Sequence, residues 1–121
     1  MIPSLSLDMP AEYPAYRSKT EQAFAEMAVA LMAAVMGDSI AVLLYEPLTF
    51  KLPGGSYTPD FMALTDGGDV AFIEVKGSTR QKNYRDARSK LRAAAELHPW
   101  FKFYEARPLR GHNWDIERIG G

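Results

Sequence analysis

The chain has 121 residues, a formal net charge of −1 and a hydrophobic fraction of 47%, which indicate one globular domain spanning residues 1–121. It contains no cysteine and only two histidines, so disulfides, zinc-thiolate sites, cysteine nucleophiles and histidine-rich metal sites are excluded. The near-neutral charge gives no overall attraction to nucleic acid, although basic residues concentrate in residues 80–92.

From its composition, we do not expect the N-terminal region to be a signal peptide. Residues 1–16 contain three prolines and no periodicity, which indicates an irregular arm without the basic start of a signal peptide. The longest apolar segment, residues 27–36, is too short to span a bilayer, so we expect a cytoplasmic protein with no membrane partner.

A capping box, Ser18 with Glu21, precedes an alanine-rich run and predicts a helix over residues 18–36 that ends at Gly37. Glu21 has two interpretations. It either caps its own helix, or it reaches a nearby site from the first turn. The residues expected to face the core recur at helical spacing: Phe24, Met27, Ala28, Leu31 and Val35.

Residues 40–52 are rich in β-branched and aromatic side chains and predict one strand, or two strands bent at Pro47. Glu46 lies inside this run. It is either an edge-strand residue turned to solvent or a further residue of a metal site. Residues 53–56 then form a turn.

Residues 57–77 contain the strongest structural and functional signals in the sequence. Two apolar runs flank the turn Asp66-Gly67-Gly68-Asp69 and predict an antiparallel hairpin. Strand alternation places Glu74 and Lys76 on one face, and hairpin pairing brings Asp60 close to Glu74. Two neighbouring carboxylates suit Mg²⁺, which can activate water beside a phosphoryl group, while a lysine can orient that water. The alternative is an ordinary exposed hairpin end with a salt bridge.

A helix over residues 81–97 follows, with Tyr84, Ala87, Leu91, Ala94 and Ala95 on its inner face. Its basic side is either a solvated surface or a stripe that contacts DNA phosphates. The candidate DNA-binding residues on and before this helix are Arg80, Gln81, Lys82, Arg85, Arg88 and Arg92.

In residues 100–106, side chains of two sets alternate along the chain, which predicts a strand. Phe101, Phe103 and Glu105 lie on one face, and Lys102, Tyr104 and Ala106 lie on the other. We expect Trp100 to cover the core rather than to stack on bases. Residues 108–113 form a loop in which His112 has no chemical role, and residues 114–119 form a short edge strand.

This order of motifs resembles the PD-(D/E)XK nuclease superfamily, and within it the phage endonuclease I type of Holliday-junction resolvase. Five matching stretches between residues 17 and 106 carry the resemblance. They are Arg17-Ser18 with Glu21, Tyr45-Glu46, Tyr57-Thr58-Pro59-Asp60-Phe61, Glu74-Val75-Lys76-Gly77 and His98-Pro99.

The resemblance implies an α/β fold with a restriction-endonuclease-like core, a mixed central β-sheet flanked by helices in the order α-β-β-β-α-β. It implies Mg²⁺-dependent cleavage of DNA, with Mn²⁺ able to substitute. By resemblance, Asp60, Glu74 and the carbonyl of Val75 bind the metal and Lys76 positions water. Glu21 and Glu46 support the metal or its waters.

The expected function is therefore a metal-dependent DNA endonuclease of phage or mobile-element type, selective for branched DNA such as a Holliday junction. A homodimer and, for a phage protein, the host cytoplasm are implied by the resemblance alone. The first alternative is a catalytically inactive DNA- or protein-binding module of the same fold. The second is an assembly protein in which the acidic hairpin end is incidental.

Overall fold

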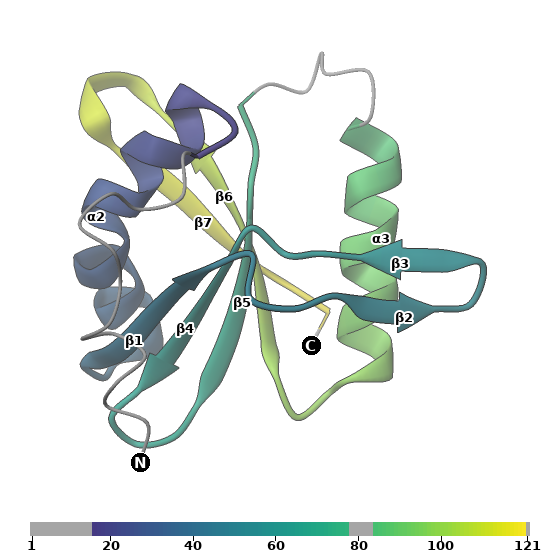
Figure 1. Cartoon of the computed structure of the whole chain (residues 1–121). Helices are drawn as coiled ribbons and strands as arrows, with labels where there is room; N and C mark the ends of the chain where they lie inside the picture. The colour runs from purple at the N-terminus through teal and green to yellow at the C-terminus, as the bar shows by residue number, and fades with distance from the viewer. Residues whose placement is uncertain (1–15, 78–83, 121) are drawn as a thin grey trace.

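The computed structural model describes residues 16–77 and 84–120. These residues form two α-helices, seven strands and one short 3₁₀ turn (Figure 1). In chain order they are α2 Lys19–Met36, β1 Ile40–Tyr45, β2 Phe50–Leu52, β3 Gly55–Tyr57, β4 Phe61–Thr65, β5 Val70–Val75, α3 Tyr84–Leu97, β6 Lys102–Pro108, η1 Arg110–His112 and β7 Trp114–Ile119.

The main sheet has five strands in the order β1-β4-β5-β6-β7. All neighbouring pairs are antiparallel except β5 and β6, which are parallel because the chain returns through α3. Helix α2 covers one face of the sheet, and α3 with the separate β2–β3 ribbon covers the other (Figure 1). The expected α/β class with a mixed sheet flanked by helices is thus confirmed. In chain order the ribbon lies between β1 and β4, which are neighbours in the sheet.

Helix α2 begins and ends as its sequence predicts. The Ser18 hydroxyl accepts a hydrogen bond from the backbone N–H of Glu21 at 3.1 Å. Gly37 ends the helix with φ of 71°, a left-handed conformation that glycine adopts without steric cost.

The inner face of α2 differs in part from the prediction. Phe24 and Ala28 are buried as expected, but Met27 and Val35 are 37% and 40% exposed, and Met32 is buried instead. Apolar residues surround much of this helix, so spacing alone could not select the i, i+4 stripe that meets the sheet.

The predicted hairpin is confirmed as β4 and β5. Their register pairs Phe61 with Ile73 and Leu64 with Val70. The backbone N–H of Thr65 donates to the carbonyl of Asp69 at 2.9 Å, which closes the turn. Pairing therefore places the start of β4 beside the end of β5.

Residues 40–52 form two strands, β1 and β2, so the second of the two predicted alternatives is confirmed, and the two strands belong to different sheets. β2 pairs with β3 around the turn at residues 53 and 54, so the ribbon is a second hairpin that the sequence analysis did not anticipate. The ribbon packs Phe50 and Tyr57 onto the α3 side of the sheet.

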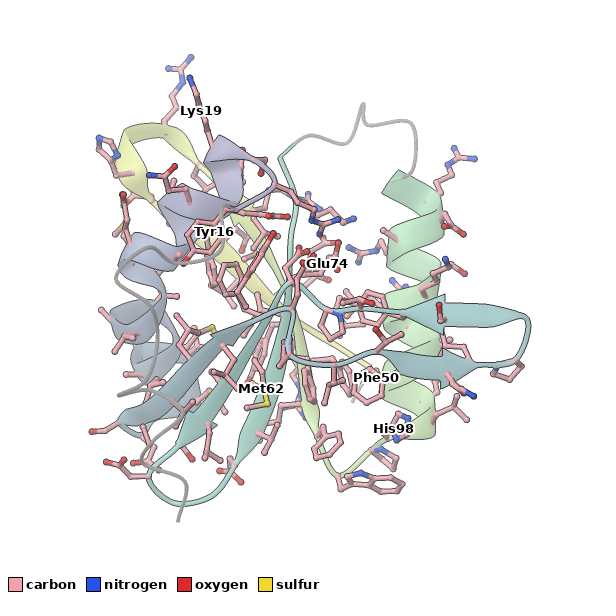
Figure 2. The ribbon with its side chains drawn as sticks, viewed as in Figure 1. Tyr16, Lys19, Phe50, Met62, Glu74 and His98 are labelled. Carbon is pink, nitrogen blue, oxygen red and sulfur yellow. The ribbon has the colours of Figure 1, made fainter. Side chains whose placement is uncertain are left out.

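Each face of the sheet has its own core. The α2-side core is formed by Phe24, Ala28, Met32, Phe61, Ala63, Ala71, Ile73, Val75, Tyr104 and Ala106. The α3-side core is formed by Phe50, Tyr57, Phe72, Leu91, Ala94, Ala95, Phe103 and Ile119. Figure 2 shows Phe50 between the ribbon and α3.

The C-terminal strands agree with the prediction, and β7 forms the edge of the sheet. The expectation for Trp100 is wrong: its side chain is 68% exposed and covers no core, because the chain turns outward between α3 and β6. Within the described residues, neither helix is long and apolar enough to cross a membrane.

Candidate active site

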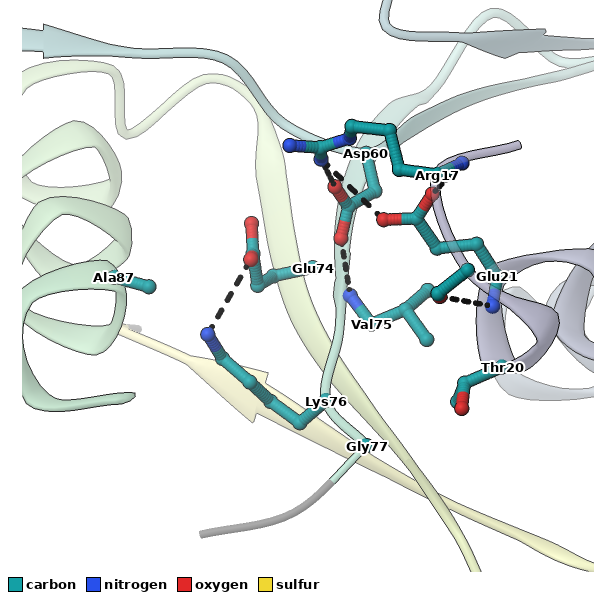
Figure 3. A pocket seen from close by; sticks show the side chains of 10 residues that line it. Arg17, Thr20, Glu21, Asp60, Glu74, Val75, Lys76, Gly77 and Ala87 are labelled. Carbon is teal, nitrogen blue, oxygen red and sulfur yellow. Dashed lines mark hydrogen bonds and ion pairs between the residues drawn. The ribbon is translucent and has the colours of Figure 1, made fainter. Parts of the chain in front are cut away.

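A pocket of about 280 Å³ opens where the N-terminus of α2, the start of β4, the end of β5 and the first half of α3 meet (Figure 3). It contains the three residues predicted from the hairpin, Asp60, Glu74 and Lys76. It also contains Arg17 and Glu21 from the start of α2. The lining residues are Arg17, Ser18, Thr20, Glu21, Asp60, Glu74, Val75, Lys76, Gly77 and Ala87.

Asp60 is held rigidly at the start of β4. Its side chain is buried, with the residue only 1% exposed. The carboxylate atom Oδ2 accepts a hydrogen bond from the backbone N–H of Val75 at 2.8 Å, and Oδ1 accepts one from the Arg17 guanidinium at 2.7 Å (Figure 3). The hairpin register thus fixes one oxygen against the neighbouring strand, while a side chain from another element holds the second.

Glu74 and Lys76 lie on the same face of β5 and its continuation, as strand alternation predicts. Lys76 Nζ lies 3.3 Å from Oε2 of Glu74, and the lysine is 3% exposed. The Tyr57 hydroxyl donates to Oε1 of Glu74 at 2.7 Å. The prediction that Asp60, Glu74 and Lys76 converge at one end of the hairpin is therefore confirmed, and these residues are buried rather than exposed.

Burial changes the acidity of both carboxyl groups. Removal from water and the neighbouring charge of Glu74 raise the pKa of Asp60 to about 8. Burial also raises the pKa of Glu74, although the hydrogen bond from Tyr57 and the charge of Lys76 oppose this rise. Such a pair is stabilised by binding either a proton or a cation.

Arg17 joins three carboxylates through one guanidinium nitrogen. Its Nη2 lies 2.7 Å from Asp60, 3.0 Å from Glu46 and 3.3 Å from Glu21. The Tyr45 hydroxyl lies 3.4 Å from Nε of the same side chain, and this hydrogen bond raises the pKa of Arg17 above its ordinary value. The guanidinium is therefore charged and supplies the positive charge that these acids need.

Glu21 does not complete its own capping box. Its Oε1 accepts hydrogen bonds from the Tyr45 hydroxyl at 2.7 Å and from the backbone N–H of Arg17 at 3.1 Å. The carboxylate therefore binds a backbone N–H just before the helix and also lines the pocket.

Glu46 is neither inside a strand nor turned freely to solvent. It follows β1 with φ of 46°, an uncommon conformation for a residue other than glycine. Its backbone N–H donates to the carbonyl of Asp60 at 2.8 Å. This bond places Glu46 beside the pocket, where its carboxylate meets Arg17 rather than the other two acids directly.

The basic stripe on α3 is shorter than expected. Arg85 and Arg92 are exposed, but Arg88 donates to Oε1 of Glu105 at 2.6 Å and to Glu117 at 3.4 Å. Arg88, a candidate DNA-binding residue, is thus held by two acids on β6 and β7. The candidates Arg80, Gln81 and Lys82 lie outside the described residues.

Three residues at or beside the site, Arg17, Tyr57 and Glu105, were not among the predicted site residues. Glu105 is the direct partner of Glu74 in the parallel β5–β6 register and accepts from Arg107 as well as Arg88. The i, i+4 spacing of Arg17 and Glu21 was a usable signal, whereas the position of Glu105 depends on a strand pairing that spacing does not reveal.

The described residues contain no group of three or more His, Cys, Asp or Glu side chains arranged as a ready metal cage. Asp60 and Glu74 nevertheless supply two buried carboxylates, and Val75, which lies between Glu74 and Lys76 in the chain, also lines the pocket. Mg²⁺ binds through one or two carboxylates and keeps several waters, so this donor set fits the expected cation.

No protein-family model matches the chain, and no curated protein matches it significantly. The chemistry of the pocket therefore has to be argued from its own side chains. A pair of buried acids beside a buried ammonium group can bind a hard cation and stabilise negative charge that builds up on a phosphate.

Proposed function

We propose that the chain is a metal-dependent DNA endonuclease that hydrolyses phosphodiester bonds. The observation that carries the proposal is the convergence of Asp60, Glu74 and Lys76, all buried, in one pocket at the end of a hairpin. Burying charged groups lowers stability unless they are paired or bind an ion, so such a cluster in a pocket is a candidate functional site. The order α2, β1, β4, β5, α3, β6 supports a restriction-endonuclease-like core for the same proposal.

In this proposal Asp60, Glu74 and the carbonyl of Val75 hold Mg²⁺, and Mn²⁺ substitutes. A bound divalent cation supplies a water of lowered pKa and neutralises charge on the phosphoryl group. Lys76, whose ammonium lies 3.3 Å from Glu74, orients the attacking water and stabilises charge that develops on phosphorus-bound oxygens. Glu21 and Glu46 act on this site through Arg17.

The substrate in this proposal is the DNA backbone. Arg85 and Arg92 are exposed on α3, whose first half borders the pocket at Ala87, and such side chains supply salt-dependent contacts to phosphates. Selectivity for branched DNA and a homodimeric assembly are parts of the proposal that rest on the sequence resemblance, as does the phage or mobile-element origin.

A second candidate is a catalytically inactive DNA- or protein-binding module of the same fold. One observation favours it: Arg17 already contacts Oδ1 of Asp60 at 2.7 Å and so neutralises part of the acidic cluster without a metal. This candidate predicts salt-dependent binding of DNA without turnover at any metal concentration.

The test compares cleavage of supercoiled plasmid, labelled linear duplex and labelled four-way junction in Mg²⁺, Mn²⁺ and EDTA. We expect cleavage only with a divalent cation, and a loss of at least about a thousandfold in Asp60→Ala and Lys76→Ala, since each removes charge stabilisation from the reacting centre. Asp66→Ala, in the exposed hairpin turn, is the matched control and should cut normally.

Circular dichroism must show that the two inactive variants remain folded. Cleavage by folded Asp60→Ala at the normal rate would refute the assignment. Tight, salt-dependent binding of DNA with no cleavage by the unmutated protein would instead establish the second candidate.

A further inference from the structure

We propose that Arg17 is an internal cation that competes with the metal for Asp60, an inference that rests on the proposed function. In the metal-free protein, Arg17 holds the acidic residues of the pocket together. Binding of the metal then requires the guanidinium to release Oδ1 of Asp60.

The contacts of Asp60 support this competition. Oδ2 is held by the backbone N–H of Val75 at 2.8 Å, a donor that the sheet fixes in place. Oδ1 is held by Nη2 of Arg17 at 2.7 Å, and the Arg17 side chain is 62% exposed. The oxygen left for a metal is therefore the one whose present partner can move into solvent (Figure 3).

Arg17 can leave Asp60 without leaving the site. Its backbone N–H donates to Oε1 of Glu21, and its Nε donates to the Tyr45 hydroxyl at 3.4 Å. Glu46 and Glu21 also remain within reach of the guanidinium. A small rotation would thus break the bond to Asp60 while the positive charge stays at the rim of the pocket.

Repulsion among the carboxylates of the pocket gives a physical reason for the Arg17 guanidinium to lie there. Asp60, Glu21 and Glu46 converge on one point from β4, α2 and the end of β1, and without a cation they would repel one another once Asp60 is ionised. Arg17 screens this repulsion until the metal arrives. The consequence is that metal affinity in the unmutated protein is lower than the carboxylates alone would give.

The test measures Mn²⁺ affinity without DNA, from the electron paramagnetic resonance signal of free Mn²⁺, in the unmutated protein and in Arg17→Gln. We expect the variant to bind Mn²⁺ more tightly, by about three- to fivefold, the upper range for removing one partly exposed ion pair. Thermal unfolding of the variant must show a folded protein.

Lys19→Gln is the matched control, because it removes the same charge from the same helix end while its side chain points away from the pocket (Figure 2). Its Mn²⁺ affinity should stay within about twofold of the unmutated protein. An equal gain in Lys19→Gln would mean that overall charge, not displacement, sets the affinity, and would overturn the inference.

Two further outcomes separate this inference from the proposed function. If the unmutated protein binds Mn²⁺ and Arg17→Gln binds it no more tightly, the competition is refuted and the nuclease proposal stands. If neither protein binds Mn²⁺, the proposed function fails and the inference fails with it.

Discussion

The α3-side face of the sheet has two halves that are built from the same strands and differ completely in chemistry. Phe72 and Glu74 are two residues apart on β5, and Phe103 and Glu105 are two residues apart on β6. One half is therefore aromatic and the other is charged, although both are buried. Figure 2 shows Phe50 near the first half and Glu74 in the second.

The aromatic half stabilises the fold. Phe72 lies 5.0 Å from Phe50 in an edge-on arrangement and 5.5 Å from Phe103 in a stacked one, measured between ring centroids. Pairs of this geometry contribute about 0.5–1.5 kcal/mol beyond the burial of their area.

The charged half lowers stability in several places. Oε2 of Glu105 is buried and accepts no hydrogen bond within the described part of the chain. Burial also raises the pKa of Asp60 and of Glu74. Apolar residues at these positions would continue the aromatic layer without the cost of burying charge, and this contrast is the physical basis for proposing a functional site in the charged half.

The contrast between the two halves would be wrong if the aromatic half contributed little to the free energy of unfolding. Phe72→Ala should lower the free energy of unfolding by about 3–5 kcal/mol, because it removes a fully buried ring and leaves a cavity between Phe50 and Phe103. The measurement is urea unfolding followed by circular dichroism. Trp100→Ala is the control: an exposed aromatic residue should change stability by only about 0.5 kcal/mol. Equal effects of the two variants would contradict this view of the core.

The charged half can be tested by its response to pH in EDTA. The pKa of Asp60 is about 8 in the folded protein against 3.8 for the exposed group, so the folded state holds a proton that the unfolded state has lost. Stability should therefore fall as pH rises from about 5 to about 8, by several degrees in Tm. Asp60→Asn cannot titrate and should flatten this fall.

Asp66→Asn is the matched control, because Asp66 is an exposed carboxyl group in the hairpin turn. It should keep the slope of the unmutated protein. A Tm that rises between about pH 5 and pH 8, or that falls equally in Asp60→Asn, would show that burial of Asp60 does not govern stability. If Mg²⁺ binds as proposed, it should restore stability mainly at the higher pH.

Local signals in the sequence were enough to predict much of this arrangement. Ser18 and Gly37 defined the ends of α2, and the Asp-Gly-Gly-Asp turn defined the hairpin. Once the hairpin was paired, side-chain alternation placed Asp60, Glu74 and Lys76 together without any knowledge of the rest of the fold.

What the sequence could not predict depends on contacts between distant segments. Arg17 lies 43 positions before its partner Asp60, and the two meet only because α2 packs on one face of the sheet with its N-terminus at the pocket. Glu105 lies beside Glu74 only because α3 returns the chain in parallel. Trp100 is apolar enough for a core, and only the path of the loop leaves it exposed.

The comparison becomes sharper with Tyr57, which belongs to both halves: its ring is in the α3-side core, and its hydroxyl donates to Oε1 of Glu74 at 2.7 Å. Tyr57→Phe keeps the ring and should lower the free energy of unfolding by about 1 kcal/mol.

The same substitution should also change how stability depends on pH. The Tyr57 hydrogen bond lowers the pKa of Glu74, so its removal raises that pKa further. Stability in EDTA should then fall more steeply with rising pH, above the ordinary pKa of a glutamate, than in the unmutated protein, the opposite of Asp60→Asn. Tyr104→Phe makes the same change in the α2-side core and should leave the slope unaltered. Parallel pH profiles for Tyr57→Phe and the unmutated protein would show that this hydroxyl supports packing alone.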